Sequence, residues 1–319
     1  MIILLYTNAD FKHVVRKRKC LSCSGESLIL RAKKHSFIFQ DLLLRILRSY
    51  FIFLFTIINI INSIVEKLFA ATNITNNSSG GRPTSIPTYL HNRSELGKVL
   101  IVNNIKFINE KRNRNGAEKD SETLKDLFET IEFEVDSKID LEAKDMIKEI
   151  EEFSQTDFSE HNISIVVMMS HGGNENGTQI VGVDNVAIPT ENIIELSIEN
   201  CHASLNGKPK IFISQCCRDS KVLCQDAIPM YIQKKKKGHS DILIAYSTLP
   251  AFTSFRYSGG WYIQKFCEFI GCHYKMYHLE EILKKINDDL VDPYDITQFV
   301  QKSTYENRGL TQCYLYKNS

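Results

Sequence analysis

Two short polar segments carry the residue types that nucleophilic catalysis needs. Ser170-His171-Gly172-Gly173 directly follows the apolar run 163–169, and Gln215-Cys216-Cys217-Arg218-Asp219 directly follows the apolar run 210–214. A thiolate attacks acyl carbons, and an imidazole can hold the thiol proton and later protonate the leaving amine. The backbone amides of Gly172 and Cys217 are candidates for binding the developing oxyanion. His171 and Cys217 therefore form a candidate dyad for acyl transfer.

The elements around these segments predict how the dyad is positioned. Short apolar or β-branched runs alternate with amphipathic segments, which is typical of βαβ crossovers and of a mainly parallel sheet covered on both faces. Ligands of such sheets bind beyond the carboxyl ends of the strands, where both segments are expected. Asp140 is expected to cap its helix. The predicted strands are 99–103, 163–169, 210–214, 241–246 and 310–316, and the predicted helices are 116–131, 140–153, 191–200, 260–270 and 278–290.

Composition places the chain among ordinary globular proteins. Its 319 residues are 43% hydrophobic and 24% charged, which excludes collagen-like and wholly disordered chains, and the net charge of +1 argues against a dedicated nucleic-acid binder. Residues 1–97 hold 13 basic and 5 acidic side chains, whereas the rest hold 26 and 33. The nine cysteines follow no disulfide framework, so we expect reduced thiols and a cytoplasmic protein.

The composition of the amino-terminal third indicates a separate region. Residues 1–71 are basic and apolar, like a prodomain, and 72–97 are rich in Asn, Ser, Gly and Pro, as linkers are. The apolar run 50–65 falls short of the roughly 17–25 residues that span a bilayer, so buried helices are favoured over a marginal membrane anchor. Cys20 and Cys23 resemble half a zinc site, but no second pair follows at motif spacing, and no metal is expected.

Residues 98–316 resemble the caspase peptidases. The resemblance rests on several motifs in order, which together are far more specific than any one of them. It implies an α/β fold with a mainly parallel six-stranded sheet and helices on both faces. The motifs are Asn113-Arg114-Asn115-Gly116-Ala117-Glu118-Lys119-Asp120, Ser170-His171-Gly172, Gln215-Cys216-Cys217-Arg218, Ala245-Tyr246-Ser247-Thr248-Leu249-Pro250, Ser254-Phe255-Arg256 and Gly260-Trp261-Tyr262-Ile263-Gln264.

The same resemblance implies a role for each site residue. Cys217 is the expected nucleophile, His171 its partner, and Gly172 and Cys217 supply the oxyanion hole through their amides. Arg114, Gln215 and Arg256 are expected to line the pocket for the residue before the cut, since two guanidiniums and an amide suit an aspartate carboxylate. Ser254 to Arg256 would pair with the peptide as a strand, and Phe255 and Trp261 would shape neighbouring subsites. No cofactor is implied.

Two residues depart from the family pattern. Cys216 stands where the family usually has Ala, but neighbouring strand residues face opposite sides, and the pattern selects Cys217 as the nucleophile. Asp219 stands where Gly is usual, and its negative charge is expected to raise the pKa of the thiol and slow acylation. A catalytically weak caspase-like scaffold that regulates another protease is therefore the alternative to an active peptidase.

The resemblance also predicts maturation and partners. Residues 98–217 match the large subunit region, 218–240 the connection between subunits and 241–319 the small subunit region, with Asp226 the expected processing site. The expected partners are protein substrates with an exposed Asp, a second copy of the chain in a homodimer of processed subunits, and adaptor or inhibitor proteins of apoptotic or immune signalling. No aspartate lies between Asp41 and Asp120, so an aspartate-specific cut cannot release the amino-terminal segment within 72–97.

Overall fold

The central element is a six-stranded sheet with the strand order β10-β9-β7-β3-β1-β2. Neighbouring strands run parallel, except that β10 is antiparallel to β9. The sheet confirms the predicted mainly parallel six-stranded α/β fold. Its strands are β1 (Glu95–Asn103), β2 (Phe133–Ile139), β3 (His161–Met169), β7 (Lys210–Gln215), β9 (Ile242–Tyr246) and β10 (Thr304–Arg308).

This computed structural model describes residues 88–89, 91–174, 177–219, 228–229, 240–256, 259–290 and 301–317. Several predictions lie outside these residues: the prodomain-like segment 1–71 with its apolar run 50–65, most of the linker 72–97, and the processing site Asp226. Among the helices of the described residues, none combines the length and apolarity needed to cross a membrane.

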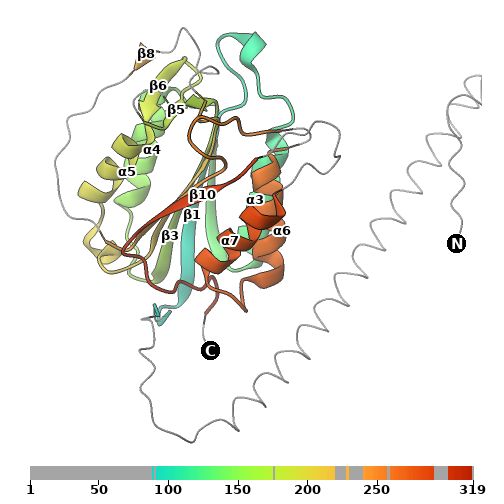
Figure 1. The fold of residues 1–319 in the computed structure, drawn as a ribbon. Helices are drawn as coiled ribbons and strands as arrows, with labels where there is room; N and C mark the ends of the chain where they lie inside the picture. Colours follow the sequence, from blue (N-terminus) through green and yellow to red (C-terminus); the bar gives the residue numbers. More distant parts are fainter. Residues whose placement is uncertain are drawn as a thin grey trace, which may run out of the picture. The chain divides into compact units, whose positions relative to one another are not determined.

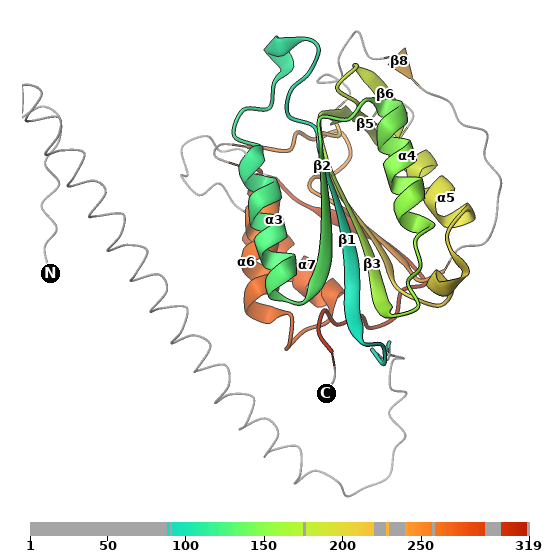
Figure 2. The same cartoon turned by 180° about the vertical axis from the view of Figure 1, so that it is seen from behind.

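Helices cover both faces of the sheet, as Figures 1 and 2 show. On one face lie α3 (Glu118–Thr130), α6 (Trp261–His273) and α7 (Leu279–Asp289), and on the other lie α4 (Ala143–Ser154) and α5 (Thr190–Glu199). The strands β3 and β7 are buried along their whole length, as expected for central parallel strands. These two strands therefore form a rigid support for whatever follows them.

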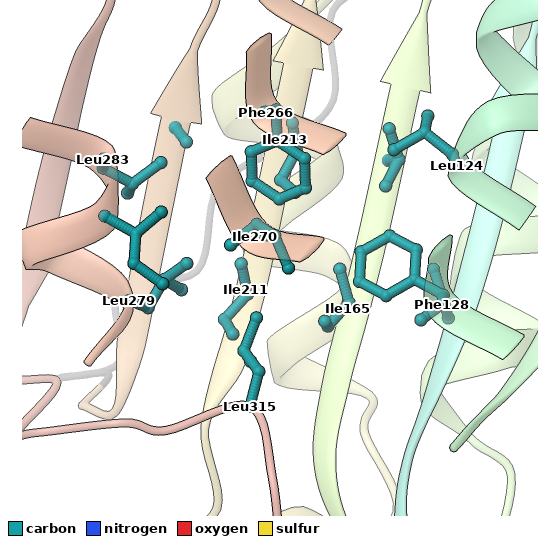
Figure 3. Packing of buried hydrophobic residues seen from close by; sticks show 14 of the residues in the cluster. Leu124, Phe128, Ile165, Ile211, Ile213, Phe266, Ile270, Leu279, Leu283 and Leu315 are labelled. Carbon is teal, nitrogen blue, oxygen red and sulfur yellow. The ribbon is translucent and has the colours of Figure 1, made fainter. Parts of the chain in front are cut away.

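The side chains of β3 alternate between the two layers of the core. Ile165, Val167 and Met169 join the cluster under α3, α6 and α7, whereas Val166 and Met168 join the cluster under α4 and α5. Figure 3 shows part of the first cluster, in which side chains from three helices pack on β3 and β7. The side chains labelled there are Leu124, Phe128, Ile165, Ile211, Ile213, Phe266, Ile270, Leu279, Leu283 and Leu315.

A second, smaller sheet lies immediately after β3 in the chain. It joins β4 (Gly172–Gly173), β5 (Gln179–Val181), β6 (Val186–Pro189) and β8 (Ile228–Pro229) in that order. The sequence patterns predicted none of these strands, because each has only two to four residues. Its first strand, β4, begins at the residue after His171 and so helps to fix the position of the His171 backbone.

The last predicted strand is wrong, and another was missed. Residues 310–316 form no strand. They bury Leu310, Cys313 and Leu315 in the core, which explains their apolar pattern, and the strand is instead the polar segment β10. The edge strand β2 was missed because several of its residues are exposed and charged.

The predicted cap at Asp140 is also wrong. The helix α4 starts later, at Ala143, and Asp140 adopts a positive φ of 57°. Its carboxylate accepts hydrogen bonds from the backbone amides of Ile105 and Lys106, at 2.7 and 2.8 Å. Asp140 therefore anchors the loop that follows β1, an alternative use of the same side-chain acceptor.

Residues before β1 are tied to the carboxy-terminal part of the chain. The Tyr89 amide donates to the Gln312 carbonyl at 3.2 Å, and the Tyr89 hydroxyl donates to the Asp241 carboxylate at 2.5 Å. β1 itself begins at Glu95, within the range 72–97 that the composition describes as a linker.

The core predicts a large cost for truncating Phe128. Its ring is fully buried, with the rings of Phe133 and Phe266 at centroid distances of 5.5 and 6.3 Å. Phe128→Ala should lower the free energy of unfolding by about 3–5 kcal/mol, measured by urea denaturation. Lys125→Ala in the same helix removes only an exposed pair with Glu129 and should change it by less than about 0.5 kcal/mol. Equal effects of the two variants would contradict this packing.

Candidate active site

The pairing of β3 with β7 brings His171 and Cys217 to one edge of the sheet. Met169 lies opposite Gln215 in the parallel register, and the Ser170 amide donates to the Gln215 carbonyl at 3.2 Å. His171 and Cys217 each come two residues after that matched pair. Both also have Arg114 and Arg256 among their charged neighbours. The two predicted reactive residues therefore share one electrostatic environment.

The imidazole of His171 is held in one tautomer. Its Nε2 atom lies 2.7 Å from the carbonyl oxygen of Arg112. A carbonyl only accepts, so Nε2 carries the hydrogen and Nδ1 keeps the lone pair. The ring of Phe107, with its centroid 4.9 Å from that of His171, packs against the imidazole. His171 is thus oriented with Nδ1 as the available base.

The two adjacent thiols lie in different surroundings. Cys216 is 2% exposed, and burial raises its pKa to about 11, while its sulfur lies 3.3 Å from the Ser214 hydroxyl. Cys217 is partly exposed, and its thiol donates to the Ser254 carbonyl at 3.8 Å. Both cysteines lie just beyond the end of β7, so the difference between them is one of burial, and Cys217 is the more accessible of the two thiols.

Gly172 has no room for a side chain. A Cβ built there would lie 2.4 Å from the Gln179 carbonyl oxygen and 2.9 Å from the Cys216 sulfur. Only glycine allows the backbone after His171 to approach the strand end this closely. The backbone of Gly172 therefore lies against the side chain of Cys216, the residue before the predicted nucleophile.

Arg114 is 3% exposed and is held by the end of β1 and of β3. One guanidinium nitrogen, Nη1, donates to the Asn103 side-chain oxygen at 2.8 Å, to the Asn104 carbonyl at 2.6 Å and to the Met169 carbonyl at 3.2 Å. Burial lowers the pKa of Arg114 to about 10, so the guanidinium stays charged near neutral pH. The N–H groups of Nε and Nη2 are therefore the candidates to donate hydrogen bonds to a ligand.

A buried carboxylate balances part of this positive charge. Asp120 is 2% exposed, and its two oxygens accept from the Gly260 amide at 2.8 and 3.1 Å. Burial raises its pKa, whereas Arg114 and Arg256 lower it. Arg256 forms an antiparallel bridge with Gly260, so both arginines of the predicted pocket are neighbours of one carboxylate.

The remaining predicted site residues come from β7, from the loop after β9 and from the first residue of α6. The Gln215 side chain donates from Nε2 to the Ser254 hydroxyl at 2.8 Å. The rings of Phe255 and Trp261 pack with centroids 5.5 Å apart, and the Trp261 amide donates to the Phe255 carbonyl at 3.2 Å. The structure thus brings all the residues predicted from the motifs to one side of the sheet edge.

Comparison with known proteins gives the family. A sequence profile of the caspase domain matches residues 96–315. The chain belongs to the caspase family. Its curated relatives include "Putative inactive caspase B" of Caenorhabditis elegans, 31% identical over 70% of this chain and 90% of that protein. Caspase-3 of Bos taurus is 30% identical over 65% and 78%, and caspase-3 of Xenopus laevis 32% over 63% and 73%.

In this caspase the resting pair is neutral. Burial and, to a smaller extent, the positive charges of Arg114, Arg112 and Arg256 together lower the pKa of His171 to about 4, although the hydrogen bond to the Arg112 carbonyl opposes this shift. Burial raises the pKa of Cys217, while Arg114 and Arg256 oppose that rise and Asp219 adds to it. Near pH 7 these shifts favour a neutral imidazole and a protonated thiol over a preformed ion pair.

Three contributors to this caspase site were missed by sequence analysis. The Arg112 carbonyl could not be found from residue type, because any residue offers a carbonyl. Asn103, which holds Arg114 and also donates to the Ala117 carbonyl, had no pattern of its own. Asp120 lies inside a motif that carried the resemblance, but its partner is 140 residues away. Within the described part of the chain, no three His, Cys, Asp or Glu side chains gather as a metal site requires.

The neutral pair predicts how thiol reactivity depends on pH. Because the pKa of Cys217 is raised and that of His171 is near 4, alkylation of Cys217 by iodoacetamide should keep rising with pH from 7 to 9. Mass spectrometry of the alkylated peptide measures the rate at this cysteine alone, and a free cysteine-containing peptide is the control. A rate that is already constant between pH 6 and 7 would show an ion pair and contradict this assignment.

Proposed function

We propose that this caspase is a cysteine endopeptidase that cleaves protein substrates after aspartate. The observation that carries the proposal is the pair of buried or half-buried guanidiniums, Arg114 and Arg256, beside the Cys217 thiol, with Asp120 as their counter-charge. With Asp120 ionised, the three groups keep one positive charge. A single carboxylate from a substrate neutralises that charge, which an uncharged side chain does not.

The proposed reaction begins at the neutral pair. His171 Nδ1 takes the Cys217 proton as the sulfur attacks the scissile carbonyl, and the backbone amides of Gly172 and Cys217 stabilise the oxyanion. The imidazolium, still bound through Nε2 to the Arg112 carbonyl, then protonates the leaving amine, leaving a thioester. Water, deprotonated by the same Nδ1, hydrolyses the thioester and restores the thiol. The original thiol proton leaves with the amine, and a proton of the water passes through Nδ1 to the sulfur, so that His171 and Cys217 end in their starting protonation states.

The proposed pocket also accounts for selectivity between acidic residues. Asparagine would place an uncharged amide against two guanidiniums and leave them without a counter-ion, which costs far more than a size change. Glutamate keeps the charge and adds one methylene, a change usually worth about 10–200-fold in kcat/KM. We therefore expect strong discrimination against Asn and a weaker one against Glu.

The proposal extends to maturation and context. As members of this family are, the protein is proposed to be made as a zymogen that is cleaved after Asp226, between the large and small subunit regions. The processed chain then forms a homodimer and acts in the cytoplasm, in apoptotic or immune signalling. These proposals are supported by the similarity to caspase-3 and by the match of the sequence motifs to the caspase family. Adaptor or inhibitor proteins complete the proposed set of partners.

A second candidate is a catalytically weak caspase that regulates another protease. One specific observation favours it: the negative charge of Asp219 adds to the raised pKa of Cys217, two residues from the nucleophile. One of the relatives also carries the word inactive in its name. The intact His171, Cys217, Arg114, Gln215 and Arg256 favour the peptidase.

A peptide series tests the proposed function. Fluorogenic peptides that differ only in the residue before the cut should be hydrolysed in the order Asp, then Glu, with Asn and Lys at background. Cys217→Ala should abolish turnover, and the matched Cys216→Ala should retain it, because only Cys217 reaches the site. Turnover lost in Cys216→Ala alone, or cleavage of the Lys peptide, would contradict the proposal. A folded protein with no hydrolysis of any peptide would favour the scaffold.

The charge of Asp219 supplies a separate prediction. Asp219→Asn removes the charge with little change of shape and should raise the rate of Cys217 alkylation at pH 7 by roughly two- to tenfold. Glu118→Gln is the control, because the charge of Glu118 acts on Arg256 and Asp120 but is not among the charges that shift the pKa of the Cys217 thiol. If Asp219→Asn alkylates at the wild-type rate, Asp219 is not what weakens the nucleophile.

A further inference from the structure

Gln301 is a fully buried glutamine whose side-chain amide makes three hydrogen bonds. Its Oε1 accepts from the Phe255 amide at 2.7 Å, and its Nε2 donates to the Ser247 carbonyl at 2.7 Å and to the Ser254 hydroxyl at 3.3 Å. All three partners belong to the loop after β9, whereas Gln301 lies three positions before Thr304, the first residue of β10. One side chain therefore joins the first residue of that loop, Ser247, to its residues 254 and 255.

The contacts of Gln301 lie on one side of the segment 254–256. The Phe255 amide is taken by Gln301, and the Phe255 carbonyl is taken by the Trp261 amide. In an extended chain, successive backbone groups point to opposite sides. The backbone groups of Ser254 and Arg256 therefore point the other way, and the Ser254 carbonyl does accept from the Cys217 thiol at 3.8 Å.

Ser254 links Gln301 to Gln215, the last residue of β7. Its hydroxyl accepts from Gln301 Nε2 on one side and from Gln215 Nε2 at 2.8 Å on the other. A hydroxyl oxygen has two lone pairs, so both bonds can exist together. Gln301, Ser254 and Gln215 thus form one continuous network that joins the loop after β9 to the end of β7, directly before Cys216-Cys217.

We infer that Gln301 is a positioning residue for the peptide-binding segment. It holds the side of this segment on which the Phe255 amide lies, so that the backbone groups of Ser254 and Arg256 can face a substrate strand, and it keeps Gln215 aligned with the carboxylate pocket. Gln301 touches neither the substrate nor the reacting sulfur, and it acts through Ser254, Phe255 and Gln215. This inference rests on the proposed function and names a residue that the motifs did not single out.

Steady-state kinetics of Gln301→Ala and of the isosteric Gln301→Glu test the inference. Glu keeps the acceptor for the Phe255 amide but sets an oxygen against the Ser247 carbonyl. Both variants should raise KM for an Asp peptide roughly tenfold, with kcat changed less than about threefold, because the segment binds ground state and transition state alike. A merely destabilised protein would lose active enzyme and lower the apparent kcat without raising KM.

The matched control is Lys302→Gln. Lys302 is the next residue and donates from Nζ to the Asn287 carbonyl at the end of α7, away from the loop after β9. Its kinetic constants should equal those of the wild type. Thermal unfolding of each variant checks that all are folded at the assay temperature.

A readout independent of turnover separates this inference from the proposed function. Iodoacetamide should alkylate Cys217 roughly threefold faster in both Gln301 variants, because the Ser254 carbonyl is no longer held against the thiol. Wild-type KM in a folded, active Gln301→Ala variant overturns the inference and leaves the proposed function intact. If the wild type hydrolyses no peptide, the proposed function has failed, and the alkylation rates alone decide: equal rates overturn the role of Gln301.

Discussion

The backbone pairing between β3 and β7 is the constraint on which the site depends. Every residue of both strands is buried, and their register sets Met169 opposite Gln215. A slip of one residue would turn every side chain of a strand to the wrong layer of the core, so packing on both faces protects the register. The chemistry is therefore placed by apolar side chains that take no part in it. His171 and Cys217 only have to follow their strands.

The second constraint is the positive charge of the buried arginines, which nearby oxygen atoms and one carboxylate balance. Burying a guanidinium is costly unless it is paired and hydrogen-bonded. Arg114 meets three backbone or side-chain oxygens, and Asp120 lies near both Arg114 and Arg256 while it also binds the Gly260 amide. The same positive environment that suits a carboxylate ligand lowers the pKa of His171, so the pocket and the base are coupled. A substitution of a pocket arginine is therefore expected to change the pKa of His171 as well.

Sequence reasoning predicted the parts of this structure whose signal is local. The runs that became β3 and β7 are apolar along their length, and the reactive residues follow them immediately. It failed where the signal lies elsewhere in the chain. The polar sequence of β10 is typical of an edge strand and hid its place in the sheet, while the core contacts of residues 310–316 imitated a strand. Asp120 and Gln301 depend on partners 140 and 46 to 54 residues away, which no pattern within one segment can reveal.

The predicted large and small subunit regions, residues 98–217 and 241–319, both contribute strands to the central sheet, where β7 pairs with β9 over five matched residues. Further ties cross the same boundary: Gly260 to Asp120, Tyr89 to Asp241, and the two-point contact of Arg308 with Glu191. None of these bonds requires the peptide chain between the two regions to be continuous. A molecule nicked between residues 219 and 240 would thus migrate as one particle under native conditions, and two polypeptides would separate only once the shared core is dissolved.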